Sequence, residues 1–181
     1  MSNKKLKLDK IDLRVISLLQ EDPNLTHTQI GEIVKRSQPS IGARLKKLKN
    51  KGILQVQAGL NFKNLDIQLA IVYLNVKNPT EIIKMVEQCP FMLNAFRTSG
   101  EHNMVVLIVN TKIKKIDNIV NHHFRNNSQV QKVSMDVVTY IIKDLVLPMD
   151  VESEILEPIL EDGCDGNCKY CKLKKVMRFK K

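Results

Sequence analysis

The sequence predicts an α+β protein in which three short helices and a small β-wing precede a βαββαβ domain. Two observations support this prediction. Apolar residues recur with helical spacing three times before residue 50, and the pattern then changes to strands that alternate with helices. We therefore expect three segments, at residues 1–62, residues 63–147 and a C-terminal extension at residues 148–181.

The first helix is predicted to begin near Asp9. Ile11, Val15 and Leu18 fall at positions i, i+4 and i+7, so they form one apolar stripe on a helix. The helix is expected to end before Pro23, because proline restricts the residue before it and lacks an amide donor. The stripe predicts a helix that buries one face in a small core.

Two more helices are predicted, with a tight turn between them. Thr26 and Gln29 have the spacing of a capping box, which opens the second helix. Ser37 is the expected N-cap of the third helix, and Pro39 is tolerated in its first turn. Gly52 is a typical stop after its last turn. A short helix, a turn and a third helix form the helix-turn-helix pattern.

The third helix has two different faces. Ile41, Leu45 and Leu48 form an aliphatic stripe, whereas the opposite face is small at its beginning and cationic toward its end. A recognition helix in the major groove of DNA has this character, because its first turns meet base edges while its cations neutralise phosphates. The predicted DNA-binding residues are Gln38, Ser40, Ala43, Arg44, Lys46 and Lys47.

These side chains suggest a division of roles on the DNA. Gln38 and Ser40 are candidates for base recognition, since glutamine can pair with adenine through two bonds and serine can bond any base. Arg44 suits guanine or phosphate, whereas Lys46 and Lys47 suit phosphate because lysine acts as a flexible point charge. The alternative interpretation is an ordinary three-helix core with basic residues facing solvent.

Positive charge is concentrated on the same segment. The chain has a net charge of +10, and residues 1–62 hold 12 Lys and Arg against 5 Asp and Glu. Such a positive electrostatic field is expected of a protein that binds a polyanion such as double-stranded DNA. The charge by itself would also be explained by a lysine-rich surface that faces solvent. No apolar run approaches the roughly 20 residues of a membrane span, and no secretory signal is present. We expect a cytoplasmic protein with reduced thiols and no membrane partner.

The segments after the third helix change to strand patterns. Ile53 to Gln57 alternate apolar and polar residues and, with Leu60 and Phe62, predict the β-wing of a winged helix-turn-helix domain. The following order βαββαβ predicts an antiparallel sheet with helices on one face, the ferredoxin-like arrangement. Its strands are expected at residues 69–77, 91–97, 104–110 and 130–142, with helices opening at Pro79 and covering residues 113–124.

The first 147 residues together resemble the Lrp/AsnC (feast/famine) family of bacterial and archaeal regulators. Leu8-Asp-Lys-Ile-Asp12, Ser37-Gln-Pro-Ser-Ile-Gly-Ala-Arg44 and Thr98-Ser-Gly-Glu101 carry the resemblance in the family's order. It implies a DNA-binding transcription regulator that forms dimers through its sheet domain and assembles further, up to octamers. It also implies an effector-binding loop at Gly100, Glu101, His102 and Asn103.

That loop departs from the family pattern. Amino-acid-binding relatives usually carry an aromatic residue and then an acid where this chain has His102 and Asn103. A carboxylate at the second position could pair with an ammonium group, so its replacement argues against amino-acid sensing and leaves the effector open. His102 has two interpretations, a pH- or metal-sensitive group and an ordinary hydrogen-bonded loop histidine.

Three cysteines lie close together in the extension. Cys164, Cys168 and Cys171 follow the spacing C-x-x-x-C-x-x-C, which over eight residues resembles the cluster motif of radical S-adenosylmethionine enzymes. Those enzymes add a large substrate barrel, for which too few residues follow Cys164, so we expect no enzyme. Soft thiolates suit an iron–sulfur cluster or zinc, and the alternatives are a metal-free redox switch or no ligand function.

The fourth ligand of such a site is left open by the sequence. Cys89, His122, His123 and a group from another subunit are candidates, and Cys89 is most simply a buried small hydrophobe. His122 and His123 cannot both face one point on a helix. Two functions remain: a DNA-binding regulator tuned by an effector or by metal and redox state, and an iron–sulfur or thiol redox protein whose basic domain aids assembly.

Overall fold

The structure, a computed structural model, describes residues 7–149 and Cys164. Contacts divide the chain into two compact units, with the division after Gln57. The sequence had placed this boundary at residue 62. No helix within the described residues is long and apolar enough to cross a membrane.

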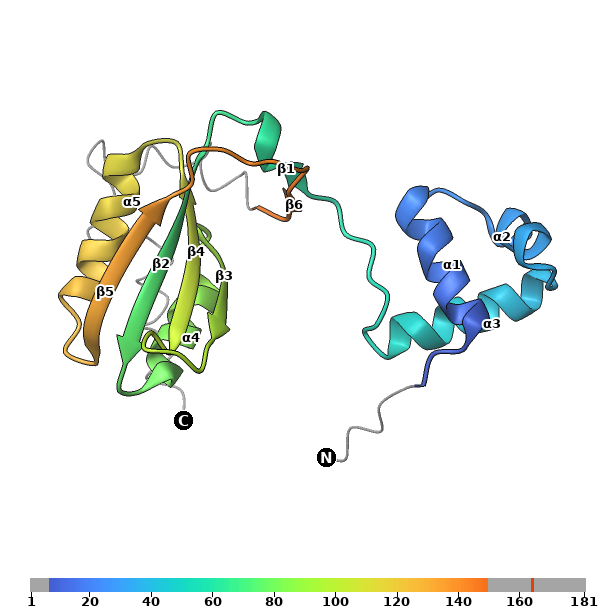
Figure 1. The fold of residues 1–181 in the computed structure, drawn as a ribbon, viewed down its shortest axis with the longest axis horizontal. Coiled ribbons are helices and arrows are strands. Elements are labelled where there is room, and N and C mark those ends of the chain that lie inside the picture. The colour runs from blue at the N-terminus through green and yellow to red at the C-terminus, as the bar shows by residue number, and fades with distance from the viewer. Residues whose placement is uncertain (1–6, 150–163, 165–181) are drawn as a thin grey trace, which may run out of the picture. The chain divides into compact units, whose positions relative to one another are not determined.

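The first unit contains the three predicted helices, α1 (Lys10–Glu21), α2 (His27–Val34) and α3 (Gln38–Asn50) (Figure 1). The predicted capping box at Thr26 is confirmed, and α1 begins next to Asp9 as predicted. Asp9 accepts hydrogen bonds from the backbone N–H groups at the start of α1, and Thr26 accepts one from the backbone N–H of the third residue of α2. Both form complete capping boxes, which satisfy amide groups that a helix start leaves without partners.

The three helices pack around one aliphatic core. Ser37 is the N-cap of α3 as predicted, but its side chain makes no capping hydrogen bond. Gly52 ends the helix with a φ of 64°, the left-handed conformation that glycine adopts without strain. The buried core residues of this unit are Val15, Leu18, Ile30, Ile41, Leu45, Leu48 and Leu54.

The predicted wing strand at residues 53–57 is wrong. These residues form no strand, and β1 (Leu60–Asn61) pairs instead with β6 (Val146–Leu147) in the second unit. The alternating pattern was misleading because Leu54 alone is buried in this stretch, whereas Ile53 and Val56 are exposed. A strand also requires a neighbouring strand for its hydrogen bonds, and the partner of β1 lies far away in the sequence.

The second unit contains the predicted βαββαβ order. Its four-stranded antiparallel sheet has the order β3-β4-β2-β5. A short 3-10 turn at Phe62–Asn64 precedes the sheet, and the last strand ends earlier than the predicted residue 142. The elements are β2 (Gln68–Val76), α4 (Pro79–Gln88), β3 (Met92–Arg97), β4 (Met104–Asn110), α5 (Ile113–Val120) and β5 (Val130–Val137).

Both helices of this unit lie on one face of the sheet, as Figure 1 shows. Alternate residues of β2, such as Ala70, Val72 and Leu74, point into the core between the sheet and the helices and are fully buried. Ile82 of α4 and Ile116 of α5 meet them there. The opposite sheet face therefore carries the other set of side chains on each strand.

Helix α5 continues directly into one π-helical turn at Asn121–Arg125. Within this turn His122 is exposed, whereas His123 is buried with 9% of its surface exposed. The two histidine side chains therefore differ in burial, with one of them at the surface. The imidazole rings touch edge to face, with their centroids 4.8 Å apart.

Candidate nucleic-acid interface and regulatory sites

A tight turn between α2 and α3 positions the candidate recognition helix. Gly31 of α2 is buried, and a Cβ atom at this position would lie 2.5 Å from the carbonyl oxygen of Arg36. Lys35 adopts a left-handed conformation with a φ of 56°, which turns the chain sharply at the end of α2. The backbone of the turn therefore packs directly on α2 and determines where α3 begins.

Helix α3 has the two faces that the sequence predicts. Its aliphatic stripe of Ile41, Leu45 and Leu48 is buried in the core. Gln38, Ala43, Lys46 and Lys47 are exposed, and Ser40 is half-buried. Whether these side chains contact DNA remains a prediction, but the exposed ones lie on a helix that the core holds in place.

Arg44 is the exception among the predicted DNA-binding residues. Its Nη1 atom donates to Oδ2 of Asp9 and to Oδ1 of Asp12, each across 2.6 Å. The Asp12 side chain is 7% exposed, so the guanidinium lies against a buried carboxylate at the start of α1. The contact of Arg44 with DNA remains a prediction, while the structure gives this residue a second role between α1 and α3.

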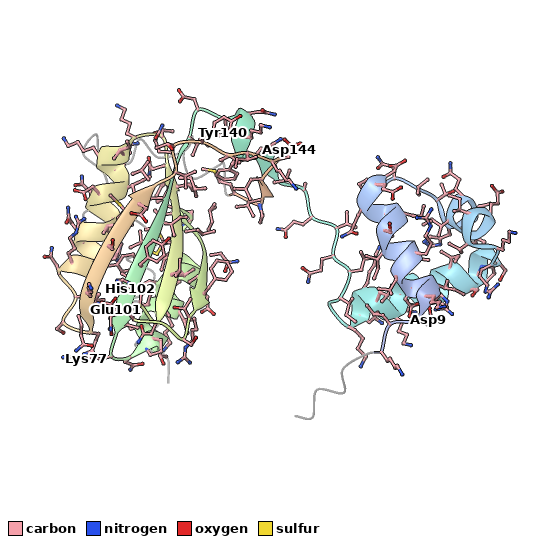
Figure 2. All side chains as sticks on the ribbon, viewed as in Figure 1. Asp9, Lys77, Glu101, His102, Tyr140 and Asp144 are labelled. Carbon is pink, nitrogen blue, oxygen red and sulfur yellow. The ribbon has the colours of Figure 1, made fainter. Side chains whose placement is uncertain are left out.

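The charged groups at this contact shift one another's pKa values. The pKa of Asp9, which Figure 2 labels at the start of α1, is lowered by the backbone N–H of Asp12 and by the Arg44 guanidinium. The pKa of Arg44 is raised by its hydrogen bonds to Asp9 and Asp12. Sequence analysis missed this cluster, because acids at the start of a helix are favoured by the helix dipole whether or not a cation packs against them.

Sequence analysis also gave no role to Arg36 in the turn before α3. Its side chain is exposed, and Nη1 donates to the carbonyl oxygen of Lys35 across 2.8 Å. A cation at this position stands beside the exposed beginning of the candidate recognition helix. Its place immediately before the N-cap residue Ser37 was the signal that could have identified it.

The predicted effector loop connects β3 to β4. Asn103 accepts a hydrogen bond from the Val76 N–H with Oδ1 at 2.9 Å, and its Nδ2 donates to the Val76 carbonyl at 2.8 Å. These two bonds continue the pairing of β2 beyond the Leu74–Met104 pair, where the ladder between β2 and β4 ends. An aspartate could not donate the second bond, so the amide at position 103 has a structural reason.

Glu101 and His102 lie in the same loop, at the end of the sheet opposite Tyr140 and Asp144 (Figure 2). The Glu101 carboxylate lies 2.5 Å from the Lys132 ammonium, which lowers the pKa of Glu101 through a hydrogen bond and through its charge. The carbonyl of Glu101 accepts a bond from Asn75. Both groups of Glu101 therefore have partners within the sheet domain.

His102 differs from its neighbours in the loop. Its Nε2 atom is buried and has no hydrogen-bond partner among the described residues. Its ring centroid lies 5.8 Å from that of Tyr73, and its carbonyl oxygen accepts a bond from the Thr98 hydroxyl. The interpretation as an ordinary hydrogen-bonded histidine therefore does not hold for Nε2 among the described residues.

Of the predicted metal ligands, the structure describes Cys164, whereas Cys168 and Cys171 lie outside the described residues. The Cys164 Sγ atom lies 3.4 Å from Nε2 of His123 in the π-helical turn. Cys89 packs against the core of the second unit. Within residues 7–149 and Cys164, no group of three or more His, Cys, Asp or Glu side chains is arranged to hold a metal ion.

Known proteins share the helix-turn-helix unit and the sheet domain of this chain. Residues 8–55 match the family described as winged helix-turn-helix DNA-binding. An HTH-type transcriptional regulator of Pyrococcus horikoshii is 22% identical over 142 residues, which span 76% of this chain and 96% of that protein. The structure is similar to that of Bacillus subtilis LrpC, with a TM-score of 0.64, 25% identity, and coverage of 76% of this chain and 99% of LrpC.

A second similar structure contains a ligand. The transcriptional regulator NMB0573 of Neisseria meningitidis, solved in complex with L-Met, has a TM-score of 0.64 and 26% identity, covering 78% of this chain and 97% of its own. These matches confirm the predicted α+β fold class, with a winged helix-turn-helix domain before an antiparallel sheet domain. They also confirm the coarse function that the sequence predicts: the chain is a DNA-binding regulator of transcription with an Lrp/AsnC-like fold.

Proposed function

We propose that this regulator binds specific sequences of double-stranded DNA as a homodimer or a larger homo-oligomer, with α3 in the major groove. The observation that supports the proposal is the division of α3 into one buried aliphatic face and one exposed face with cations toward its end. The protein acts in the cytoplasm without catalysing a reaction, and a signal received in the second unit or the extension sets its affinity for DNA.

The exposed face of α3 divides into two functional parts. Gln38 and Ser40 stand at the beginning of the helix, which approaches base edges when a recognition helix enters the major groove. Lys46 and Lys47 stand toward its end and neutralise phosphates on either side of the groove. Base identity is therefore recognised by the first turn, while the later turns supply affinity that does not depend on sequence.

An uncovered apolar patch supports dimerisation through the sheet. The sheet patch consists of Ile71, Tyr73, Phe96 and Val105, which lie on the face opposite α4 and α5. Tyr73 pairs with Val105 across the strands, and Phe96 pairs with Val105 from the other side. Phe96 is 49% exposed and the other three are half-buried. A second copy would bury this apolar surface and place two α3 helices on successive major grooves, about 34–36 Å apart.

The loop at Gly100, Glu101, His102 and Asn103 is the proposed effector site. The amide of Asn103 is bonded to Val76 through both of its polar atoms, and an ammonium group would have to compete with Lys132 for the carboxylate of Glu101. The buried Nε2 atom of His102 remains as the polar contact for a ligand. We therefore expect an effector that hydrogen-bonds to an imidazole and does not depend on an ammonium group for recognition.

The cysteine extension is proposed to bind an iron–sulfur cluster or zinc, which makes it a metal or redox input to DNA binding. Cys164, Cys168 and Cys171 supply soft thiolate ligands within eight residues. The contact of Cys164 with a buried imidazole supports the proposal, because the thiol and the imidazole are the two side chains that zinc prefers.

The proposed function is tested by selecting a binding site from random duplexes and measuring binding by fluorescence anisotropy over a range of salt concentrations. Lys47→Ala is expected to weaken binding to all sequences alike and to reduce the salt slope by about one unit, because one phosphate contact is lost. Gln38→Ala is expected to lose about 1–3 kcal/mol of discrimination at one base pair. Lys84→Ala in α4 is the matched control, because it removes an exposed lysine from the second unit.

Two results would reject this assignment of roles. If both α3 variants lost the same affinity for the selected duplex and for random duplexes, Gln38 and Lys47 would not differ as base and phosphate contacts. Unchanged affinity in both α3 variants, together with redox turnover that does not depend on DNA, would favour the redox protein with a basic assembly domain.

A further inference from the structure

The imidazole of His27 lies against the candidate recognition helix. His27 is the first residue of α2, and its side chain is exposed. A Cβ atom at Gly42 of α3 would lie 3.4 Å from Nδ1 of His27 and 3.7 Å from its Cε1. The ring therefore packs beside the backbone of α3, at a position where the helix has no side chain of its own. Helix α2 in this way adds a side chain to the surface of α3.

Gly42 lies on a side of α3 that borders the exposed cationic face. Gln38 comes four residues before Gly42 and Lys46 four residues after it, so the three positions are neighbours on the helix surface. Both side chains are exposed. His27 thus stands beside a candidate base contact and a candidate phosphate contact, although it comes from a different helix.

Helix α2 does not need this imidazole for its own stability. Thr26 and Gln29 already form the capping box that opens the helix. The first turn of a helix lies at the positive end of the helix dipole, which favours acidic side chains and gives a histidine no advantage. Among the described residues, His27 forms no hydrogen bond. The polar atoms of the ring are therefore not committed within the protein.

The opposite side of α3 carries acidic groups. Arg44 follows Gly42 by two residues, which places it on the other side of the helix, where it pairs with Asp9 and Asp12. Two carboxylates and one guanidinium leave a net negative charge there, which repels a phosphate. The first turn of α2 has no acidic residue. A DNA phosphate beside α3 is therefore favoured on the side where His27 lies.

We propose that His27 donates a hydrogen bond to a phosphate of the DNA backbone when α3 occupies the major groove, an inference that rests on the proposed placement of α3. In helix-turn-helix complexes the helix before the recognition helix crosses the DNA backbone. Phosphate contacts fix the register and orientation of the protein on the duplex without reading its sequence. The bond from His27 thus holds α3 in the groove while Gln38 and Ser40 face the bases.

The inference is tested on the full-length chain with the selected duplex and with versions of that duplex in which one phosphate at a time is replaced by a neutral methylphosphonate. The variants are His27→Ala and His27→Gln, the second of which keeps a hydrogen-bond donor. His122→Ala is the matched control, because it removes an exposed histidine from the second unit. Thermal unfolding followed by circular dichroism is measured for each variant, which separates loss of folding from loss of contact.

We expect His27→Ala to bind the selected duplex about tenfold more weakly than the wild type, and to lose the same factor on random duplexes, with an unchanged unfolding midpoint. One methylphosphonate linkage should weaken the wild type by a similar factor and leave His27→Ala unaffected, because the bond it removes is already absent. His27→Gln should recover part of the affinity, and His122→Ala should bind like the wild type.

Two results would overturn the role of His27. One is wild-type affinity in His27→Ala. The other is a set of methylphosphonate duplexes that all weaken His27→Ala as much as the wild type, which would make the contact with Gly42 purely structural. Binding by Lys47→Ala, measured on the same duplexes, decides separately whether α3 contacts DNA. A failure of His27 is therefore distinguishable from a failure of the proposed function.

Discussion

Arg44 of α3 donates a hydrogen bond from Nη1 to Oδ1 of Asp12 in α1 across 2.6 Å. The Asp12 side chain is 7% exposed and that of Arg44 is 27% exposed, so the carboxylate is buried and the guanidinium covers it. The same Nη1 atom donates to Asp9, the N-cap of α1. One side chain of the candidate recognition helix thus fixes the position of α3 against the first helix of the unit.

Arg44→Ala is expected to lower the free energy of unfolding by about 1–3 kcal/mol, because it leaves the buried Asp12 carboxylate without its counter-charge. DNA affinity is expected to fall as well, since α3 loses a contact that orients it. Arg44→Lys should recover only part of both, because an ammonium group cannot reproduce the guanidinium fork. Urea unfolding followed by circular dichroism measures the first quantity and fluorescence anisotropy the second.

Lys47→Ala is the control for this pair of measurements. Lys47 is exposed on the same helix, so its removal should change stability by less than about 0.5 kcal/mol while it weakens DNA binding. An Arg44→Ala protein as stable as the wild type would show that the contact with Asp12 does not position α3.

The Asp9 carboxylate gives the first unit a pH dependence of defined sign. Its pKa in the folded state is lowered from 3.8, first by the backbone N–H of Asp12 and then by Arg44. A carboxyl group with a lowered folded pKa stabilises the folded state above its unfolded pKa, and this contribution is lost as the pH falls through the folded value. Asp9→Asn is therefore expected to be less stable than the wild type at pH 7, with a difference that shrinks below about pH 4.

Urea unfolding at a series of pH values measures this difference between wild type and Asp9→Asn. Asparagine remains a good N-cap, so the comparison isolates the charge. The same substitution in an Arg44→Ala background should show a smaller pH-dependent difference, because one of the two causes of the shift is gone. A difference between the two proteins that does not vary with pH would contradict the assignment.

The sequence predicted the elements that depend on local interactions. The spacing of Thr26 and Gln29 located the start of α2, and the apolar stripe that begins at Ile11 placed the start of α1 near Asp9. The apolar stripes of α3 and the alternation in β2 likewise depend on helix and strand period. These local signals were sufficient for the α+β fold class and for the exposed face of α3.

The features that the sequence did not predict join residues far apart in the chain. Leu60 pairs with Leu147 and Arg44 pairs with Asp9. The contact of His123 with Cys164 was one of several possibilities that the sequence left open. No periodicity reports such a contact, because each partner alone looks like an ordinary surface or core residue. The strand at residues 53–57 was predicted wrongly for this reason, since an alternating pattern does not say which strand, if any, lies beside it.

Gly31→Ala is expected to destabilise the first unit by about 1–3 kcal/mol, because the new Cβ would lie 2.5 Å from the backbone oxygen of Arg36 and would push the turn away from α2. DNA affinity should fall with it, since this turn places the start of α3. Gly42→Ala in α3 is the matched control. Its Cβ would meet only the flexible His27 side chain at 3.4 Å, and alanine favours the helix by up to about 1 kcal/mol.

The two alanine variants are thus expected to change thermal stability in opposite directions. Differential scanning calorimetry measures both, and anisotropy with the selected duplex measures DNA binding. If both glycines tolerated alanine equally well, the close approach of the turn to α2 would not constrain the recognition helix.

Val105→Arg in β4 is expected to convert the proposed dimer into a monomer. Val105 stands between Tyr73 and Phe96 in the sheet patch, so an arginine there places an unpaired charge at the centre of an apolar interface, which costs several kcal/mol in the dimer. In a monomer the same side chain can extend into solvent from the open sheet face, so folding should be retained. Ile83→Arg in α4 is the matched control, because Ile83 is an apolar residue with 37% of its surface exposed outside the sheet patch.

Sedimentation equilibrium gives the mass of each variant, and circular dichroism checks that it folds. The monomeric variant should also bind the selected duplex more weakly than the wild type, because each copy of α3 then engages one half-site without the second tethered beside it. A Val105→Arg protein that keeps the mass of the wild type would place the interface elsewhere on the second unit. Loss of the oligomer in Ile83→Arg, with Val105→Arg unchanged, would move it to the helical face of the sheet domain.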